Sequence, residues 1–258
     1  MSDHRDDVAL ARRALALLDL TELGDDATDD DVLALCGRAR SPHGDVAAVC
    51  VWPRHVALAR RTLGNDSPVR IATVVNFPHG MDTIDEVCAE TRQALADGTD
   101  EIDLVLPWRA FAGGARDQAG AMVAAVRDEV PEGKRLKVIL ETGELLTMTN
   151  IDAASRLAIR QGADFIKTST GKTPNGASLE ATELMLRAIH DADAPVGLKP
   201  SGGIRTLDDA AAYLAQADEI MGPGWVTPAT FRFGASGLWN ALVAAIEGGS
   251  GVRAEGQY

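Results

Sequence analysis

The chain has 258 residues, of which 46% are hydrophobic, and it carries a formal net charge of −13. Such an acidic protein is a poor partner for nucleic acid or anionic membranes, and no apolar stretch reaches the ~18 residues that a membrane span needs. The three cysteines lack CxxC spacing, which argues against a disulfide framework or a zinc site, and the charged amino-terminal segment lacks a signal peptide's apolar core, so we expect a cytoplasmic protein without a metal or cofactor.

Helical and strand-like segments alternate along the chain. Residues 6–18 and 31–40 have the apolar spacing of amphipathic helices, so residues 1–45 are predicted to form a helical amino-terminal extension. Short apolar segments follow, most of them separated by helical segments of roughly 10–16 residues. We interpret these segments as strands at residues 47–52, 69–76, 101–106, 136–141, 164–167, 196–199, 219–221 and 231–235.

This alternation predicts the architecture. Strands that alternate with helices form a parallel sheet, and eight such strands predict a closed (β/α)8 TIM barrel of the α/β class. An open doubly wound sheet is the rival architecture, but no GxGxxG motif follows the first strand. No linker divides the chain, so residues 1–258 are interpreted as a single domain with a flexible tail at residues 248–258.

Two of the predicted strands end in a lysine: Lys167 closes ADFIK, and Lys199 closes VGLK. A lysine buried at the end of a strand is costly unless it has a function. The chain otherwise favours arginine, but only lysine can lose its proton and become a nucleophile. Asp103 lies within the apolar strand EIDLVL, so its carboxylate is expected to face inward and to pair with a cation.

The two lysines and this carboxylate predict a chemistry. If Lys167 and Lys199 lie close together, one cation lowers the pKa of the other and leaves a neutral amine that can attack a carbonyl. The product is a Schiff base, which indicates a class I aldolase, with Asp103 relaying protons. The spacing does not decide which lysine forms the imine. Structural ion pairs for both lysines and for Asp103 are the alternative interpretation.

A nucleotide-binding loop is excluded by the same stretch of sequence. Residues 168–173, TSTGKT, resemble the end of a P-loop. That motif requires a glycine where Ile166 stands, and Pro174 replaces the start of the helix that should follow. We therefore expect no nucleoside triphosphate at this loop.

Two later turns instead predict a site for one phosphomonoester. SGG at residues 201–203 precedes a helix with Thr206 as its expected N-cap, and GASG at residues 234–237 precedes the last helix. Glycines let backbone N–H groups approach an anion, and a helix amino terminus adds a favourable dipole. Lys172 and Arg205 would supply positive charge beside these turns.

The ordered sequence blocks resemble the deoxyribose-phosphate aldolase family. The blocks are LDLTEL, VCVWPR, NFPHG, DEIDLVLP, KVILETGEL, GADFIKTSTGK, KPSGGIRT and FRFGAS, and they cover nearly the whole chain. The resemblance implies a TIM barrel and the reversible cleavage of 2-deoxy-D-ribose 5-phosphate to D-glyceraldehyde 3-phosphate and acetaldehyde. The expected partners are therefore small aldehydes and sugar phosphates, and a homodimer is the candidate assembly.

The resemblance also implies roles for individual residues. It assigns the Schiff base to Lys167, the perturbing charge to Lys199, the proton relay to Asp103 and a proton transfer at the α-carbon to Tyr258. Where relatives often have a second serine after FGAS, this chain has Gly237, which removes one hydroxyl donor. The predicted substrate and phosphate contacts are Asp19, Thr21, Cys50, Thr170, Gly171, Lys172, Gly202, Gly203, Arg205, Gly234 and Ser236.

Several interpretations stay open at this point. The barrel could be an aldolase or isomerase of another sugar phosphate, or a non-catalytic phosphate-binding protein. Tyr258 could belong to a disordered tail rather than to the site. Finally, Lys137 and Glu141 have the spacing of residues on one face of a strand, so we expect them to pair with each other inside the barrel.

Overall fold

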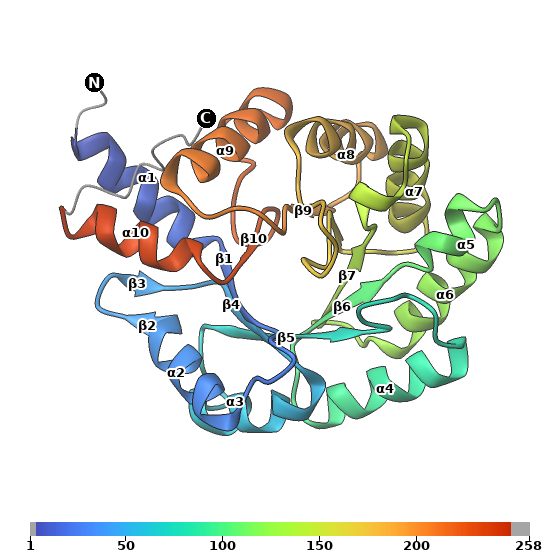
Figure 1. Cartoon of the computed structure of the whole chain (residues 1–258), viewed down its shortest axis with the longest axis horizontal. Helices are drawn as coiled ribbons and strands as arrows, with labels where there is room; N and C mark the ends of the chain where they lie inside the picture. The colour runs from blue at the N-terminus through green and yellow to red at the C-terminus, as the bar shows by residue number, and fades with distance from the viewer. Residues whose placement is uncertain (1–3, 249–258) are drawn as a thin grey trace.

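A closed barrel of parallel strands forms the centre of the computed structural model, which describes residues 4–248 (Figure 1). Within these residues the sheet has eight strands in the order β10-β1-β4-β5-β6-β7-β8-β9. The Leu198 N–H donates to the Thr230 carbonyl and the Arg232 N–H donates to the Leu198 carbonyl, which joins β9 to the residues just before β10, and the Gly234 N–H of β10 donates to the Pro200 carbonyl, so the ring closes. The strands are β1 (Leu18–Glu22), β4 (Ala48–Val51), β5 (Arg70–Val75), β6 (Glu101–Val105), β7 (Arg135–Ile139), β8 (Phe165–Lys167), β9 (Gly197–Lys199) and β10 (Phe233–Ala235).

Helices surround the barrel and cover its outer face (Figure 1). A short hairpin, β2 (Arg40–Ser41) and β3 (Gly44–Asp45), precedes β4. Thr206 caps α9 as predicted: its hydroxyl accepts from the Asp209 N–H, which satisfies a free donor at the start of the helix. The helices are α1 (His4–Ala16), α2 (Asp29–Ala39), η1 (Pro53–His55), α3 (Val56–Leu63), α4 (Ile84–Ala96), α5 (Trp108–Ala112), α6 (Arg116–Glu129), η2 (Thr142–Glu144), α7 (Met148–Arg160), α8 (Leu179–Ala192), α9 (Leu207–Met221) and α10 (Leu238–Ile246).

The predicted (β/α)8 barrel is confirmed, but two of its strands were assigned wrongly. The segment 1–45 is not wholly helical, because β1 (Leu18–Glu22) is a barrel strand that pairs with both β10 and β4. Residues 219–221, predicted to be a strand, instead form the last turn of α9. The count of eight was right because one missed strand replaces one wrong strand.

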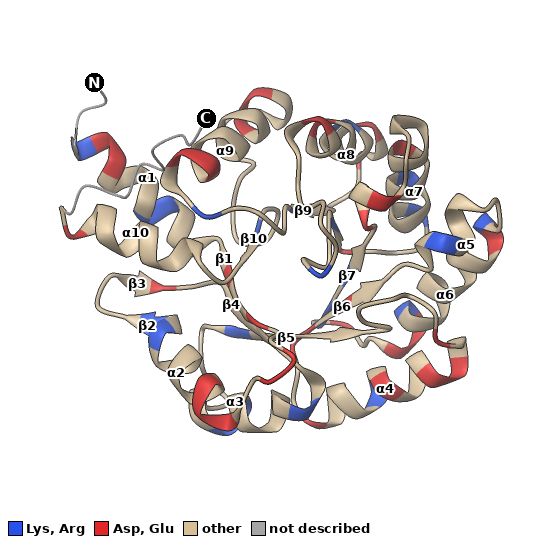
Figure 2. Ribbon diagram, viewed as in Figure 1, with Lys and Arg blue, Asp and Glu red and all other residues tan. Residues whose placement is uncertain are grey.

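The barrel interior has an apolar side and a charged side. Along β4 and β5, Cys50, Ala72 and Val74 pack against one another and against Leu23. Strands β6 to β9 and β1 instead carry buried charged side chains, as does Arg232 just before β10, and Figure 2 shows charged residues on the central strands as well as on the outer helices. Charges in this interior are far from water, so each of them needs a partner.

No helix within residues 4–248 is both long enough and apolar enough to cross a membrane. The main apolar core lies between the strands and the surrounding helices, and most of its members have no exposed surface. Burying one aliphatic or aromatic side chain in this way stabilises a fold by roughly 1.5–3 kcal/mol. This outer core therefore holds the strand ends, and the side chains on them, in fixed positions.

Candidate active site

Lys167 and Lys199 lie side by side at the carboxyl end of the barrel. They are the last residues of β8 and β9 and are direct partners in the parallel register of these strands. Their side chains are 4% and 0% exposed, respectively. In a parallel barrel, residues in equivalent register with inward side chains meet in one layer. The predicted pairing of the two lysines is thus present.

Asp103 lies between the two lysines, as the sequence predicted. Its Oδ2 contacts Lys167 Nζ at 3.0 Å and Lys199 Nζ at 2.8 Å. The Asp103 carboxylate has no exposed surface. Burial alone would raise the pKa of Asp103, but the charges of Lys137, Lys199 and Lys167 hold it well below its usual range. Asp103 is therefore ionised and draws both amines to one oxygen atom.

A second layer of charges lies deeper in the barrel. Lys137 Nζ contacts Glu101 Oε2 at 2.6 Å and Asp103 Oδ1 at 2.8 Å. Arg232 contacts Asp19 Oδ1 at 2.6 Å and Glu101 Oε1 at 2.9 Å. We call the whole set the buried charge cluster; it consists of three carboxylates and four basic groups, namely Asp19, Glu101, Asp103, Lys137, Lys167, Lys199 and Arg232.

The predicted pairing of Lys137 with Glu141 is wrong. Lys137 pairs with members of the buried charge cluster, whereas Glu141 lies four residues further along, beyond the end of β7. Four residues of an extended strand span about 13 Å, which is too far for an ion pair. Glu141 instead accepts the Thr170 hydroxyl at 2.5 Å and the Thr173 hydroxyl at 3.2 Å, so it fixes the loop after β8.

The three lysines of the cluster differ in their number of acidic partners. Lys137 has three carboxylates within 3.3 Å, Lys199 has two within 2.8 Å, and Lys167 has one at 3.0 Å. Burial lowers the pKa of Lys167, and the charge of Lys199 adds to this effect against the attraction of Asp103. Burial acts on Lys199 too, but its carboxylate partners raise its pKa. Lys167 is therefore the lysine that most readily becomes a neutral amine.

The glycine-rich turns also meet at the carboxyl end of the barrel. The Ala177 N–H donates to the Gly202 carbonyl at 3.0 Å, and Ser201 forms a parallel bridge with Gly234. A Cβ added to Gly176 would lie 2.4 Å from the Gly202 carbonyl oxygen. Gly202 itself has φ +87°, a conformation that favours glycine. Gly176 was not predicted from the sequence, although its place beside the TSTGKT loop was a signal.

The predicted basic residues near these turns differ in their surroundings. Lys172 Nζ contacts Asp25 Oδ1 at 2.6 Å and lies 5.8 Å from the centre of the Trp52 ring. The Arg205 side chain and Ser236 are exposed beside their turns. Gly171 and Gly203 are likewise exposed on the loops. Backbone N–H groups and basic side chains at this rim can hold a phosphate.

The other predicted contacts lie deeper or on the opposite wall. Asp19 belongs to the buried charge cluster, where Lys199 Nζ lies 2.6 Å from its Oδ2. The Thr21 hydroxyl donates to the Asp19 carbonyl at 2.9 Å. Cys50 lies in the apolar wall, and burial raises the pKa of its thiol. Tyr258 lies outside the described residues, so its predicted role stays a prediction.

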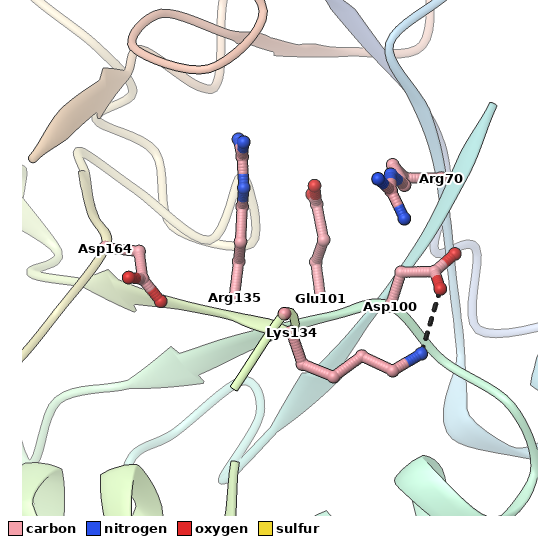
Figure 3. Close-up of a pocket in the computed structure, with 7 residues that line it drawn as sticks. Arg70, Asp100, Glu101, Lys134, Arg135 and Asp164 are labelled. Atoms are coloured by element: carbon pink, nitrogen blue, oxygen red, sulfur yellow. Dashed lines mark hydrogen bonds and ion pairs between the residues drawn. The ribbon is translucent and has the colours of Figure 1, made fainter. Parts of the chain in front are cut away.

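A cavity of about 260 Å³ lies at the opposite end of the barrel, beside the amino ends of β5 to β8. Figure 3 shows Glu101 between Arg135 and Arg70 in this cavity, with Lys134 bound to Asp100 at its edge. TIM-barrel chemistry occurs at the carboxyl end of the strands. The lysine end is therefore the candidate reactive centre, and of the buried charge cluster only Glu101 lines the basal cavity.

Comparisons with known proteins agree with this geometry. Residues 13–241 match the model of the DeoC/LacD family aldolase. A deoxyribose-phosphate aldolase of Agrobacterium fabrum is 50% identical over 248 residues, which cover 96% of each chain. A candidate deoxyribose-phosphate aldolase of Toxoplasma gondii has a TM-score of 0.88 at 27% identity over 98% of this chain and 99% of that one. The deoxyribose phosphate aldolase of Aeropyrum pernix, at 23% identity, has a TM-score of 0.71 over 94% of this chain and 97% of that one, and supports the fold alone.

Proposed function

The chain belongs to the DeoC/LacD aldolase family, and we propose that it is a deoxyribose-phosphate aldolase. It would cleave 2-deoxy-D-ribose 5-phosphate reversibly to D-glyceraldehyde 3-phosphate and acetaldehyde. The observation that carries the proposal is the uneven pairing in the buried charge cluster. Lys167 has a single carboxylate partner and faces the carboxyl end of the barrel, so it is the lysine best suited to act as the nucleophile.

In the cleavage direction, the neutral Lys167 amine adds to the aldehyde carbon of the open-chain sugar. The carbinolamine takes up a proton and loses water, which gives an iminium ion, an electron sink. Removal of the proton from the C3 hydroxyl then breaks the C2–C3 bond and releases glyceraldehyde 3-phosphate, while the electron pair forms an enamine. Protonation of the enamine carbon and hydrolysis of the imine release acetaldehyde and restore the amine. Each step conserves atoms and charge and needs no external cofactor.

The groups beside Lys167 suit the proton transfers of this sequence. Asp103 Oδ2 contacts both lysines, so it can pass a proton between Lys167 and Lys199 with little movement. We assign to Lys199 the role of the neighbouring cation that disfavours a charged Lys167. The carboxylate and the cation together would also stabilise the carbinolamine as its hydroxyl leaves.

The rim of the barrel suits the phosphate end of the substrate. The turns at 201–203 and 234–237 lie at one end of the molecule with Lys172 and Arg205, although the Ser201 and Gly234 N–H groups already donate to the Thr168 hydroxyl and the Pro200 carbonyl. We propose that these groups bind the 5-phosphate, with Ser236 as a hydroxyl donor. The three cysteines, Cys36, Cys50 and Cys88, are buried as free thiols, which supports a reducing compartment such as the cytoplasm.

The decisive experiment is chemical trapping of the imine. Incubation with acetaldehyde and borohydride is expected to leave an N-ethyl group on Lys167, identified by peptide mass spectrometry. Lys167→Arg keeps the positive charge but forms no imine, so it should show neither the adduct nor cleavage of deoxyribose 5-phosphate. An adduct on another lysine, or equal turnover by the variant, would overturn the proposal. A panel of other sugar phosphates tests the substrate assignment separately.

A further inference from the structure

The deepest lysine of the barrel, Lys137, has no role in the reaction described above. Its ammonium group contacts Glu101 at 2.6 Å, Asp103 at 2.8 Å and Asp19 at 3.3 Å. The side chain has no exposed surface. A buried ammonium group with three carboxylate contacts is held in its charged form. Lys137 is therefore a permanent cation directly beneath the reactive layer.

Lys137 determines how the charge of Asp103 is shared. One carboxylate oxygen, Oδ1, is bound to Lys137 at 2.8 Å. Only the other oxygen, Oδ2, remains for Lys167 and Lys199, at 3.0 Å and 2.8 Å. One negative charge thus serves three amines. Because Lys137 offsets part of this negative charge, Asp103 stabilises the protonated form of Lys167 less than it would if Lys167 were its only partner.

The total charge of the cluster leads to the same conclusion. Three ionised carboxylates face four basic groups, one of which, Arg232, stays protonated in any protein. An uncompensated charge is costly in a buried site, so the cluster favours the loss of one lysine proton. Lys167 has the fewest carboxylate contacts and the nearest route to solvent, since Lys137 and Lys199 have no exposed side-chain surface.

We infer that Lys137 and Glu101 are positioning residues that set the protonation state of Lys167 through Asp103. Lys137 favours the neutral, nucleophilic amine, and Glu101 moderates this effect because it neutralises Lys137 and Arg232 from below. The inference deepens the proposed function, since it concerns the reactive form of the proposed nucleophile. It assigns roles to two residues that do not touch the reacting carbon.

Other titratable groups also surround Lys167. Asp103 approaches from β6, Lys199 from β9 and Cys50 from β4. Burial raises the pKa of the Cys50 thiol, so it stays neutral at the pH of turnover. Glu141, after β7, accepts from hydroxyl donors of the next loop, and its charge also interacts with Lys167. The only groups below the reactive layer whose charge reaches Lys167 through Asp103 are thus members of the buried charge cluster, within the part of the chain that the structure describes.

Glu101 is suited to a conservative substitution. Its carboxylate borders the basal cavity, where Figure 3 shows it between Arg135 and Arg70. A glutamine of the same shape keeps one acceptor for the Lys137 ammonium, its NH2 group replaces the oxygen that accepts from Arg232, and the cavity has room for a water beside it. Glu101→Gln therefore removes a charge without changing the packing. Lys137→Met removes the opposite charge and retains an unbranched side chain of similar length.

The two substitutions should move the pKa of Lys167 in opposite directions. In Lys137→Met, three carboxylates face three cations and Asp103 Oδ1 becomes free, so Lys167 holds its proton to higher pH. In Glu101→Gln, two carboxylates face four basic groups, so Lys167 loses its proton at lower pH. Single nearby charges shift a pKa by roughly 1–3 units, and we expect each shift to exceed about one unit. The double variant restores an excess of one cation and should return close to the wild type.

The test measures the pH dependence of reductive methylation of Lys167 by formaldehyde and cyanoborohydride, read by peptide mass spectrometry. This readout requires a neutral amine but no aldol activity. Acetaldehyde trapping on the wild type is run in parallel. Absence of a trapped adduct on Lys167 would count against the proposed function, whereas the methylation profiles of the variants test the inference. Lys134→Met is the matched control, because Lys134 binds Asp100 outside the cluster and its loss should leave the profile unmoved.

Shifts of the pH midpoint of Lys167 methylation in opposite directions in the two single variants support the inference. Shifts in the same direction, or unmoved profiles in folded proteins, would overturn it, because a merely structural role lowers activity without moving a pKa in two opposite senses. Thermal unfolding of each variant shows whether it is folded. If Lys137→Met does not fold, Glu101→Gln alone decides: a methylation midpoint that rises or stays constant refutes the proposed role.

Discussion

Lys199, the neighbour of the proposed nucleophile, offers a quantitative test of the site. Lys199→Met removes one of the two cations that share Asp103 Oδ2. Both ammonium nitrogens lie within 3.0 Å of this oxygen, so they are less than about 6 Å apart, and at an effective dielectric constant of about 20 their repulsion is at least about 3 kcal/mol. This corresponds to roughly two pKa units. The substitution also leaves Asp103 Oδ2 to Lys167 alone, which acts in the same direction.

The expected result is a rise of about two units in the pH at which Lys167 becomes reactive. The assay is the rate of borohydride trapping with acetaldehyde as a function of pH, compared between Lys199→Met and the wild type. At neutral pH the variant should trap about a hundredfold more slowly, since each unit is a tenfold loss of neutral amine, but it should recover at alkaline pH. An unmoved profile, or slow trapping at every pH, would refute the electrostatic reasoning.

Two further predictions concern the phosphate turns and the stability of the barrel. Gly176→Ala places a Cβ 2.4 Å from the Gly202 carbonyl oxygen, so we expect a loss of about 1–3 kcal/mol in the free energy of unfolding and a raised KM for the phosphorylated substrate. Gly37→Ala in α2, whose Cβ would have no neighbour within 4 Å, is the control, and equal KM values for the two variants would contradict the prediction. The pKa of Lys167 is lower in the folded protein than in the unfolded chain. Between the folded pKa and about 10.4 the unfolded chain therefore binds one more proton, so the free energy of unfolding rises with pH in this range. The free energy of unfolding in urea is measured from neutral to alkaline pH for the wild type and for Lys167→Met. It should rise with pH more steeply in the wild type, by up to about 1.4 kcal/mol per pH unit, and equal slopes would argue against a neutral Lys167.

The alternation of strands and helices could be predicted from the sequence, but the first strand of the barrel and the segment at 219–221 were predicted wrongly. The strand β1, Leu18–Glu22, follows a helix with a single residue between them and has five residues, so no turn signal separates it from α1. Residues 219–221 are apolar enough to suggest a strand. The buried positions of α9, Ala210, Tyr213, Leu214 and Ala217, continue at helical spacing toward them, and this periodicity was the better guide.

The upper half of the site was predictable because it depends on strand ends alone. Lys167 and Lys199 each close a strand, and parallel strands bring their carboxyl ends to one rim. The lower half depends on register, which no local pattern encodes. Glu101 and Lys137 meet because β6 and β7 pair Asp103 with Lys137, and Arg232 reaches them only because the barrel closes between β9 and β10.

Lys172 already has an anion before any substrate arrives. Its ammonium group lies 2.6 Å from a carboxylate oxygen of Asp25, whose side chain is 89% exposed. A phosphate that binds this lysine therefore exchanges places with Asp25, which returns to water at little cost. The free energy that this contact contributes to binding is the difference between the attraction of Lys172 to the phosphate and its attraction to Asp25, rather than the full attraction of an unpaired cation. In the proposed reaction, the sugar phosphate and glyceraldehyde 3-phosphate both make this contact. When either one leaves, Asp25 can return to Lys172, so the lysine is not left unpaired. This exchange suits an enzyme that works in both directions.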